Sequence, residues 1–179
     1  MPPSPQLTLE RERNVRVVIS LTFGILLAYV AGSVLGTQVV LNNVAAMGLD
    51  VTLAMRWSSS LSDVAGLAGT LLPLMVIALL PGWLILDWLG RRPTMRVAPA
   101  WYILTGAMAI AVLHPALNWA FGVDVFAPAR TMPGLLGQAL AGGLGGVAVA
   151  LSRREGVGGC PGFGQKNCRR FLRCSTPDQ

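Results

Sequence analysis

The sequence predicts an all-α protein, a polytopic transmembrane four-helix bundle with both termini in the cytoplasm. Of the 179 residues, 53% are hydrophobic and 12% are charged, which is too little charge for the surface of a water-soluble domain. The apolar residues also form four blocks without Asp, Glu, Lys or Arg. Because about 20 residues cross the hydrocarbon core as a helix, each block can form one span. The blocks are Val17–Leu49, Val64–Leu86, Val97–Val123 and Thr131–Ser152.

The positions of the basic residues predict the orientation. All but two of the 14 Lys and Arg residues precede the first block, join the second to the third, or follow the fourth; Arg56 and Arg130 are the exceptions. Cytoplasmic segments carry the excess of Lys and Arg, so we expect both termini and the loop between the second and third spans to lie in the cytoplasm. The basic residues that give the net charge of +6 flank the apolar blocks, and no nucleic-acid-binding motif accompanies them. This excludes nucleic acid as a partner.

Residues 1–15 contain prolines and alternating Arg and Glu, and we expect them to be a disordered cytoplasmic lead. A secretory signal is the alternative, but the apolar run is longer than a signal core of about 7–15 residues and no Ala-x-Ala site closes it. The transmembrane domain then covers residues 16–152. Its first span, 17–36, carries small residues at every fourth position, on one face that another helix can approach closely. These residues are Gly24, Ala28, Gly32 and Gly36.

Two interpretations of residues 37–62 are open. The segment is half apolar, with Asp50 and Arg56 as its only charges. In the first interpretation, Val39–Trp57 is a helix that lies along the outer membrane surface with Trp57 at headgroup depth. In the second, the whole segment is an extracytoplasmic loop.

The second and third spans are predicted at 63–88 and 97–122. The second opens with Asp63 and contains Pro73 and Pro81, each of which removes a backbone donor and frees a carbonyl oxygen. Aromatic side chains are expected at both membrane interfaces. We place Trp119 at the outer interface and the others at the cytoplasmic one, namely Trp83, Trp88, Trp101 and Tyr102.

The fourth span, 132–152, is rich in glycine on one face, which includes Gly142 and Gly146. We expect this face to pack against the small residues of the first span; a homo-oligomer or a larger membrane complex built through such faces is the alternative. Residues 153–179 are expected to be a basic, disordered cytoplasmic tail. Its cysteines are spaced C-x7-C-x5-C, without the close ligand pairs of a zinc site, so no metal is predicted.

His114 is the only histidine and lies inside the third span, directly before Pro115. A buried polar group at membrane depth needs a partner or a wet cavity. Two interpretations are open: a neutral His114 that links helices by hydrogen bonds, or a cluster that binds a small ligand or passes a proton. Haem ligation would need a second axial ligand such as Met108, and no cofactor is predicted. The other residues that the threading gathers at this outer end are Asp63, Asn118, Gln138 and Arg130.

No catalytic motif accompanies these residues. The sequence has no H-E-x-x-H, no G-x-S-x-G and no Walker loop, so we expect no enzyme activity. The sequence favours a structural or accessory component of the inner membrane, surrounded by the lipid bilayer. The alternative is a small transporter or proton-conducting subunit that uses His114 and Asp63.

Short polar motifs mark the ends of the spans. Thr37-Gln38 ends the first span, Ser62-Asp63 opens the second, and Ala129-Arg130-Thr131 precedes Gln138 in the Gly-rich fourth span. In this order of features the chain resembles small, uncharacterised bacterial inner-membrane proteins with four spans, over about residues 15–152 and without the tail. The resemblance implies the four-span architecture and no particular activity.

Overall fold

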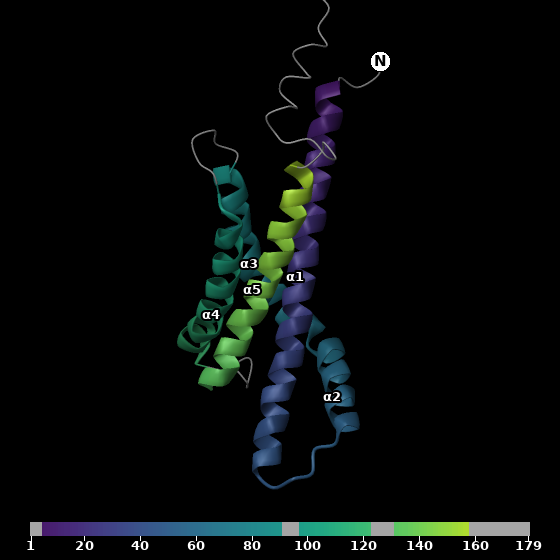
Figure 1. Ribbon diagram of the computed structural model, residues 1–179. Helices are drawn as coiled ribbons and strands as arrows, with labels where there is room; N and C mark the ends of the chain where they lie inside the picture. The colour runs from purple at the N-terminus through teal and green to yellow at the C-terminus, as the bar shows by residue number, and fades with distance from the viewer. Residues whose placement is uncertain (1–4, 91–96, 123–130, 158–179) are drawn as a thin grey trace, which may run out of the picture.

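Five helices make up the described part of the chain (Figure 1). The structure is a computed structural model and describes residues 5–90, 97–122 and 131–157. These residues contain no strand, in agreement with the all-α prediction. The helices are α1 (Pro5–Ala46), α2 (Leu53–Gly66), α3 (Ala68–Gly90), α4 (Pro99–Phe121) and α5 (Met132–Val157).

Four of these helices are long and apolar enough to cross a membrane, so the chain is a multi-span membrane protein. This confirms the prediction of four spans. α2 has 14 residues and is too short to cross the hydrocarbon core, which takes about 20. The spanning segments are Glu10–Ala46, Ala68–Gly90, Pro99–Ala120 and Met132–Arg153.

α1 extends beyond the predicted first span at both ends. It begins at Pro5, so the segment that we expected to be a disordered lead is helical from that residue on; residues 1–4 lie outside the described residues. It also continues past Gly36 to Ala46. Gly48 then adopts a φ of 87°. Glycine adopts this left-handed conformation without steric cost, and the chain turns away from the helix axis there.

Residues 37–62 form a helical hairpin, and not one continuous helix over Val39–Trp57 or a loop without helices. The first part completes α1, and α2 then runs back alongside it (Figure 1). Thr52 caps α2, because its hydroxyl accepts a hydrogen bond from the N–H of Met55 at 3.3 Å and satisfies one of the free donors of the first turn.

The second span begins later than predicted because the helix breaks at Leu67. The N–H of Leu67 donates to the carbonyl oxygen of Asp63 at 2.9 Å and closes the last turn of α2. α3 starts one residue later, at Ala68, and continues in the same general direction. Asp63 therefore lies in the last turns of α2 and does not open the second span.

α5 lies between α1 and α4 and approaches both closely through glycine (Figure 1). A Cβ atom at Gly145 would lie 2.9 Å from the Cβ of Ala28 on α1, a separation that real Cβ atoms do not show. Gly142 and Gly146 instead face α4, where added Cβ atoms would overlap the backbone of Gly106 and Tyr102. Gly145, and not the predicted Gly142 and Gly146, thus meets the first span.

The small residues of α1 face the interior of the bundle. A Cβ atom at Gly24 would lie 3.3 Å from the Trp83 ring, and one at Gly32 would lie 3.0 Å from the Met75 side chain. Ala28 and Gly36 are buried as well. Because α3 and α5 of the same chain already fill this face, it has no room for the helix of a second copy.

The aromatic residues divide between the core and the surface. Trp83 is fully buried and Tyr102 is 8% exposed, so both are core residues and do not face the lipid. Trp88, Trp101 and Trp119 are exposed on the outside of the bundle. Their place at the membrane interfaces stays a prediction.

Candidate functional site

Asp63 and Gln138, two of the polar residues that the sequence gathers around His114, each contact α1. Asp63 accepts a hydrogen bond from the Thr37 hydroxyl at 2.7 Å, which joins α2 to α1. Gln138 is fully buried on α5, and its amide donates to the carbonyl oxygen of Gly32 at 2.8 Å. Asp63 and Gln138 therefore contact α1 at different turns.

His114 is buried on α4, with 8% of its surface exposed. α4 and α5 run antiparallel, with Ile110 next to Gly142. His114 lies one turn beyond Ile110, and Gln138 lies one turn before Gly142, so the register places both residues at nearby levels of this interface.

Asn118 lies on α4, one turn after His114. Asn118 is exposed, and its carbonyl oxygen accepts the N–H of Gly122 at 2.8 Å where α4 ends. Gly122 there has a φ of 64°, the left-handed cap that glycine favours. Arg130 lies outside the described residues.

A first polar cluster joins α1 to α2, and we call it the α1–α2 cluster. Arg56 donates to the Gln38 amide oxygen at 2.7 Å and to the Asn42 amide oxygen at 2.9 Å. The Gln38 amide in turn donates to the Ser60 hydroxyl at 3.2 Å. The cluster consists of Thr37, Gln38, Asn42, Arg56, Ser60 and Asp63. Through these bonds, the polar side chains Arg56, Ser60 and Asp63 of α2 contact α1 of the same chain.

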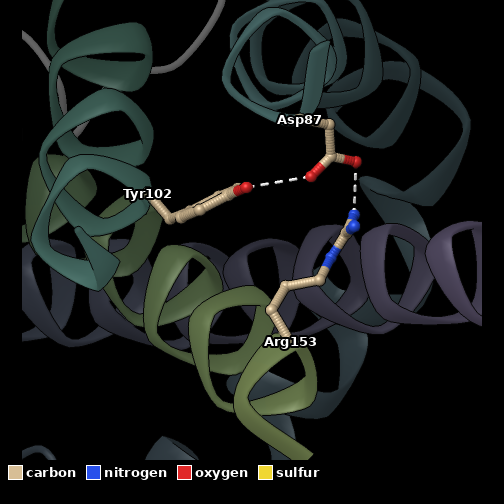
Figure 2. Close-up of polar contacts among 3 residues, drawn as sticks. All are labelled: Asp87, Tyr102 and Arg153. Carbon is tan, nitrogen blue, oxygen red and sulfur yellow. Dashed lines mark hydrogen bonds and ion pairs between the residues drawn. The ribbon is translucent and has the colours of Figure 1, made fainter. Parts of the chain in front are cut away.

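A second cluster, the α3–α4–α5 cluster, lies at the opposite end of the bundle and consists of Asp87, Tyr102 and Arg153. Figure 2 shows the three side chains converging from three helices. The Tyr102 hydroxyl donates to one carboxylate oxygen of Asp87 at 2.9 Å. Arg153 donates to the other oxygen at 2.5 Å and forms an ion pair with it.

The Asp87 carboxylate of this second cluster is buried. Only 5% of the Asp87 side chain is exposed, against 25% of the Arg153 side chain. A carboxylate so far from water is stable only when charged or polar donors surround it. Both carboxylate oxygens have such a donor. Trp83 extends the network, because its indole N–H donates to the backbone carbonyl of Tyr102 at 3.1 Å.

This arrangement can hold three spans in fixed register. Charge-assisted hydrogen bonds are short and stronger than neutral ones, and each partner here comes from a different helix. Since each carboxylate oxygen already has a donor, the cluster is suited to joining helices. Its residues complete their own charge balance without a bound ligand.

Sequence reasoning missed the α3–α4–α5 cluster although a signal was present. Asp87 is the acidic residue in the last turn of the second span, and Arg153 lies at the end of the fourth. The threading that gathered polar residues at one end of the bundle places these two at the other end, together with Tyr102. An aromatic residue at the start of a span predicts a membrane interface, and a basic residue at the end of a span predicts a cytoplasmic tail, so neither pattern indicates a partner for Asp87.

Among the described residues, no group of three or more His, Cys, Asp or Glu side chains is placed to hold a metal ion. The three cysteines of the tail lie outside this part of the chain.

Comparison with models of protein families, with curated proteins and with solved structures finds no match to this chain.

Proposed function

We propose that the protein is a structural or accessory component of the bacterial inner membrane, and not an enzyme. The observation that carries this proposal is the α3–α4–α5 cluster, in which Asp87 engages Tyr102 and Arg153 from two other spans. Such a cluster fixes the relative positions of helices. The glycine contacts of α5 support the same role, because backbones packed so closely resist the sliding that a transport cycle needs.

The proposal includes an orientation with both termini in the cytoplasm. The first turns of α1, the ends of α3 and α5 and the start of α4 lie at one end of the bundle (Figure 1). Arg11, Arg13 and Arg16 are exposed at this end, and Arg153 lies there too. The positive-inside rule assigns such an end to the cytoplasm.

A small transporter or proton-conducting subunit is the second candidate. Two observations favour it. The helix breaks at Leu67, next to Asp63, and discontinuous helices form the binding sites of many transporters. In addition, the buried Ser33 hydroxyl and Gln138 amide oxygen have no hydrogen-bond partner among the described residues, and buried polar atoms of this kind often contact water.

A flux measurement separates the two functions. The purified protein is reconstituted into liposomes that contain a pH-sensitive dye, and a potassium gradient with valinomycin drives protons inward. A structural protein gives the same rate of acidification as liposomes without protein. A proton conductor gives a faster rate, which His114→Ala or Asp63→Asn would reduce.

The control is Asn43→Ala, because the Asn43 side chain is exposed on α1 and does not belong to the candidate cluster around His114. Each variant is first shown to have the helical circular dichroism and elution volume of the original protein. Flux that exceeds the protein-free rate and is lost in His114→Ala but kept in Asn43→Ala would overturn the structural proposal.

A further inference from the structure

The two faces of α2 differ in chemistry. The polar residues Arg56, Ser60 and Asp63 bind α1. The adjoining face, about a quarter of a turn around the helix, carries Leu53, Trp57 and Leu61 at every fourth position, with 72%, 67% and 69% of their surfaces exposed. An apolar stripe this exposed indicates contact with a membrane or with another protein.

The packing contacts give the heights of the exposed tryptophans along the bundle, beginning with Trp119. Gly145 of α5 lies beside Gly24 of α1, and Gly142 lies beside Gly106 of α4. With a rise of 1.5 Å per residue, Trp119 on α4 lies about 24 Å from the level of Gly24, toward the end where α4 stops.

α2 reaches the same level by an independent route. The hydrogen bond between Arg56 and Asn42 fixes the register of α2 against α1. The same rise per residue then places Trp57 about 26 Å from the level of Gly24, on the same side as Trp119. Two exposed tryptophans from different helices therefore lie at nearly one height.

The other exposed tryptophans define a second level. Trp83 of α3 packs against Gly24, which places Trp88 about 8 Å and Trp101 about 3 Å beyond Gly24 in the opposite direction. The two tryptophan levels are thus about 30 Å apart, which is the thickness of the hydrocarbon core of a bilayer. Tryptophan is enriched at both boundaries of that core.

We propose that the Leu53–Trp57–Leu61 face of α2 inserts into the headgroup boundary of the membrane that the four spans cross. Trp57 then joins Trp119 in one aromatic belt. Leu61 lies below this belt, toward the hydrocarbon, and Leu53 lies above it, toward water. The helix is held upright by its polar bonds to α1 and does not lie flat along the surface.

The absence of positive charge on the exposed stripe also fits a neutral boundary layer. Arg56 is the one basic residue of α2, and its guanidinium is bound to Gln38 and Asn42. The stripe therefore binds lipid through apolar contact and the tryptophan ring, and not through attraction to anionic headgroups.

Site-directed spin labelling tests the proposal. Cysteine is introduced by Leu53→Cys, Trp57→Cys, Leu61→Cys and Trp119→Cys in a chain whose Cys160, Cys168 and Cys174 are replaced by serine. The labelled protein is reconstituted into vesicles of phosphatidylethanolamine and phosphatidylglycerol. Power saturation with oxygen and with a water-soluble nickel chelate gives the depth of each label. Asp50→Cys is the aqueous control and Ser60→Cys, on the buried face, is the control for protein contact.

The expected depth increases from position 53 to 57 to 61, and positions 57 and 119 agree within about one helical turn of 5.4 Å. Nickel accessibility at all three α2 positions equal to that at position 50 would show a stripe in water. Low accessibility to both reagents, as at position 60, would show that a protein covers the stripe. Either result would overturn the proposal.

Discussion

Asp87 is the acidic residue that the bundle buries, and both of its oxygens are bonded by side chains from other helices. Removing one partner of a buried ion pair usually costs more than the pair contributes, because the remaining charge is left without compensation. Removing a neutral hydrogen-bond donor costs less. The three residues of the α3–α4–α5 cluster are therefore expected to differ in their effects on stability.

We expect Asp87→Asn to lower the free energy of unfolding by about 2–3 kcal/mol, since Arg153 then lacks its counter-charge but is partly exposed. Tyr102→Phe removes one hydrogen bond and should cost about 1 kcal/mol. The double variant Asp87→Leu with Arg153→Met should be less destabilised than Asp87→Leu alone, because it leaves no unpaired charge. Unfolding titrations in mixed micelles of dodecyl maltoside and sodium dodecyl sulfate measure these differences.

Equal losses for Asp87→Asn and Tyr102→Phe would show that Asp87 is neutral in the folded bundle. A double variant whose loss equals the sum of the single losses would show that Asp87 and Arg153 act independently of each other.

At the scale of the helices, α5 makes the closest contacts. A Cβ atom added at Gly145 would fall on atoms of Gly24 and Ala28 of α1. A methyl group there must push the two backbones apart, and such overpacking costs about 1–3 kcal/mol. Gly137, two turns earlier on the same helix, has Leu35 as its nearest neighbour, at 3.9 Å from a built Cβ.

We therefore expect Gly145→Ala to destabilise the protein by about 1–3 kcal/mol, whereas Gly137→Ala is neutral or stabilises it by up to about 1 kcal/mol through the higher helix propensity of alanine. Thermal unfolding in detergent, followed by circular dichroism at 222 nm, compares the two. The matched pair separates packing from propensity. A loss at Gly137→Ala as large as that at Gly145→Ala would contradict the assigned contact between α1 and α5.

The helix boundaries show which elements can be predicted from the sequence. Long apolar runs between basic segments fix the four spans, because the hydrocarbon core requires about 20 residues of low polarity. The continuation of α1 to Ala46 and the break at Leu67 depend on hydrogen bonds between α1 and α2, such as the one from Thr37 to Asp63. Contacts between residues far apart in the sequence leave no local pattern.

At the scale of the whole molecule, the same reasoning explains how the polar clusters were assigned. The threading estimates the height of each polar residue along the bundle, but it does not fix which face of each helix the residue occupies. Asp63 therefore contacts α1 and not α4, and Asp87 pairs with Arg153, 66 positions away in the chain. The pairing needs the rotation of each helix about its axis, which depends on the glycine contacts of α5.

The alternation of the four spans determines which segments face the cytoplasm. Labelling of single cysteines in intact spheroplasts with a membrane-impermeant maleimide identifies the segments that do not. In the chain without native cysteines, Glu12→Cys and Asp50→Cys place a thiol at either end of the first span, and Ala98→Cys and Thr131→Cys place one directly before the third and the fourth. We expect a membrane-impermeant maleimide to label positions 50 and 131 in intact spheroplasts, and positions 12 and 98 only after the membrane is opened. Labelling of position 12 or 98 in sealed spheroplasts, or protection of position 50 or 131, would contradict the four-span bundle with both termini in the cytoplasm.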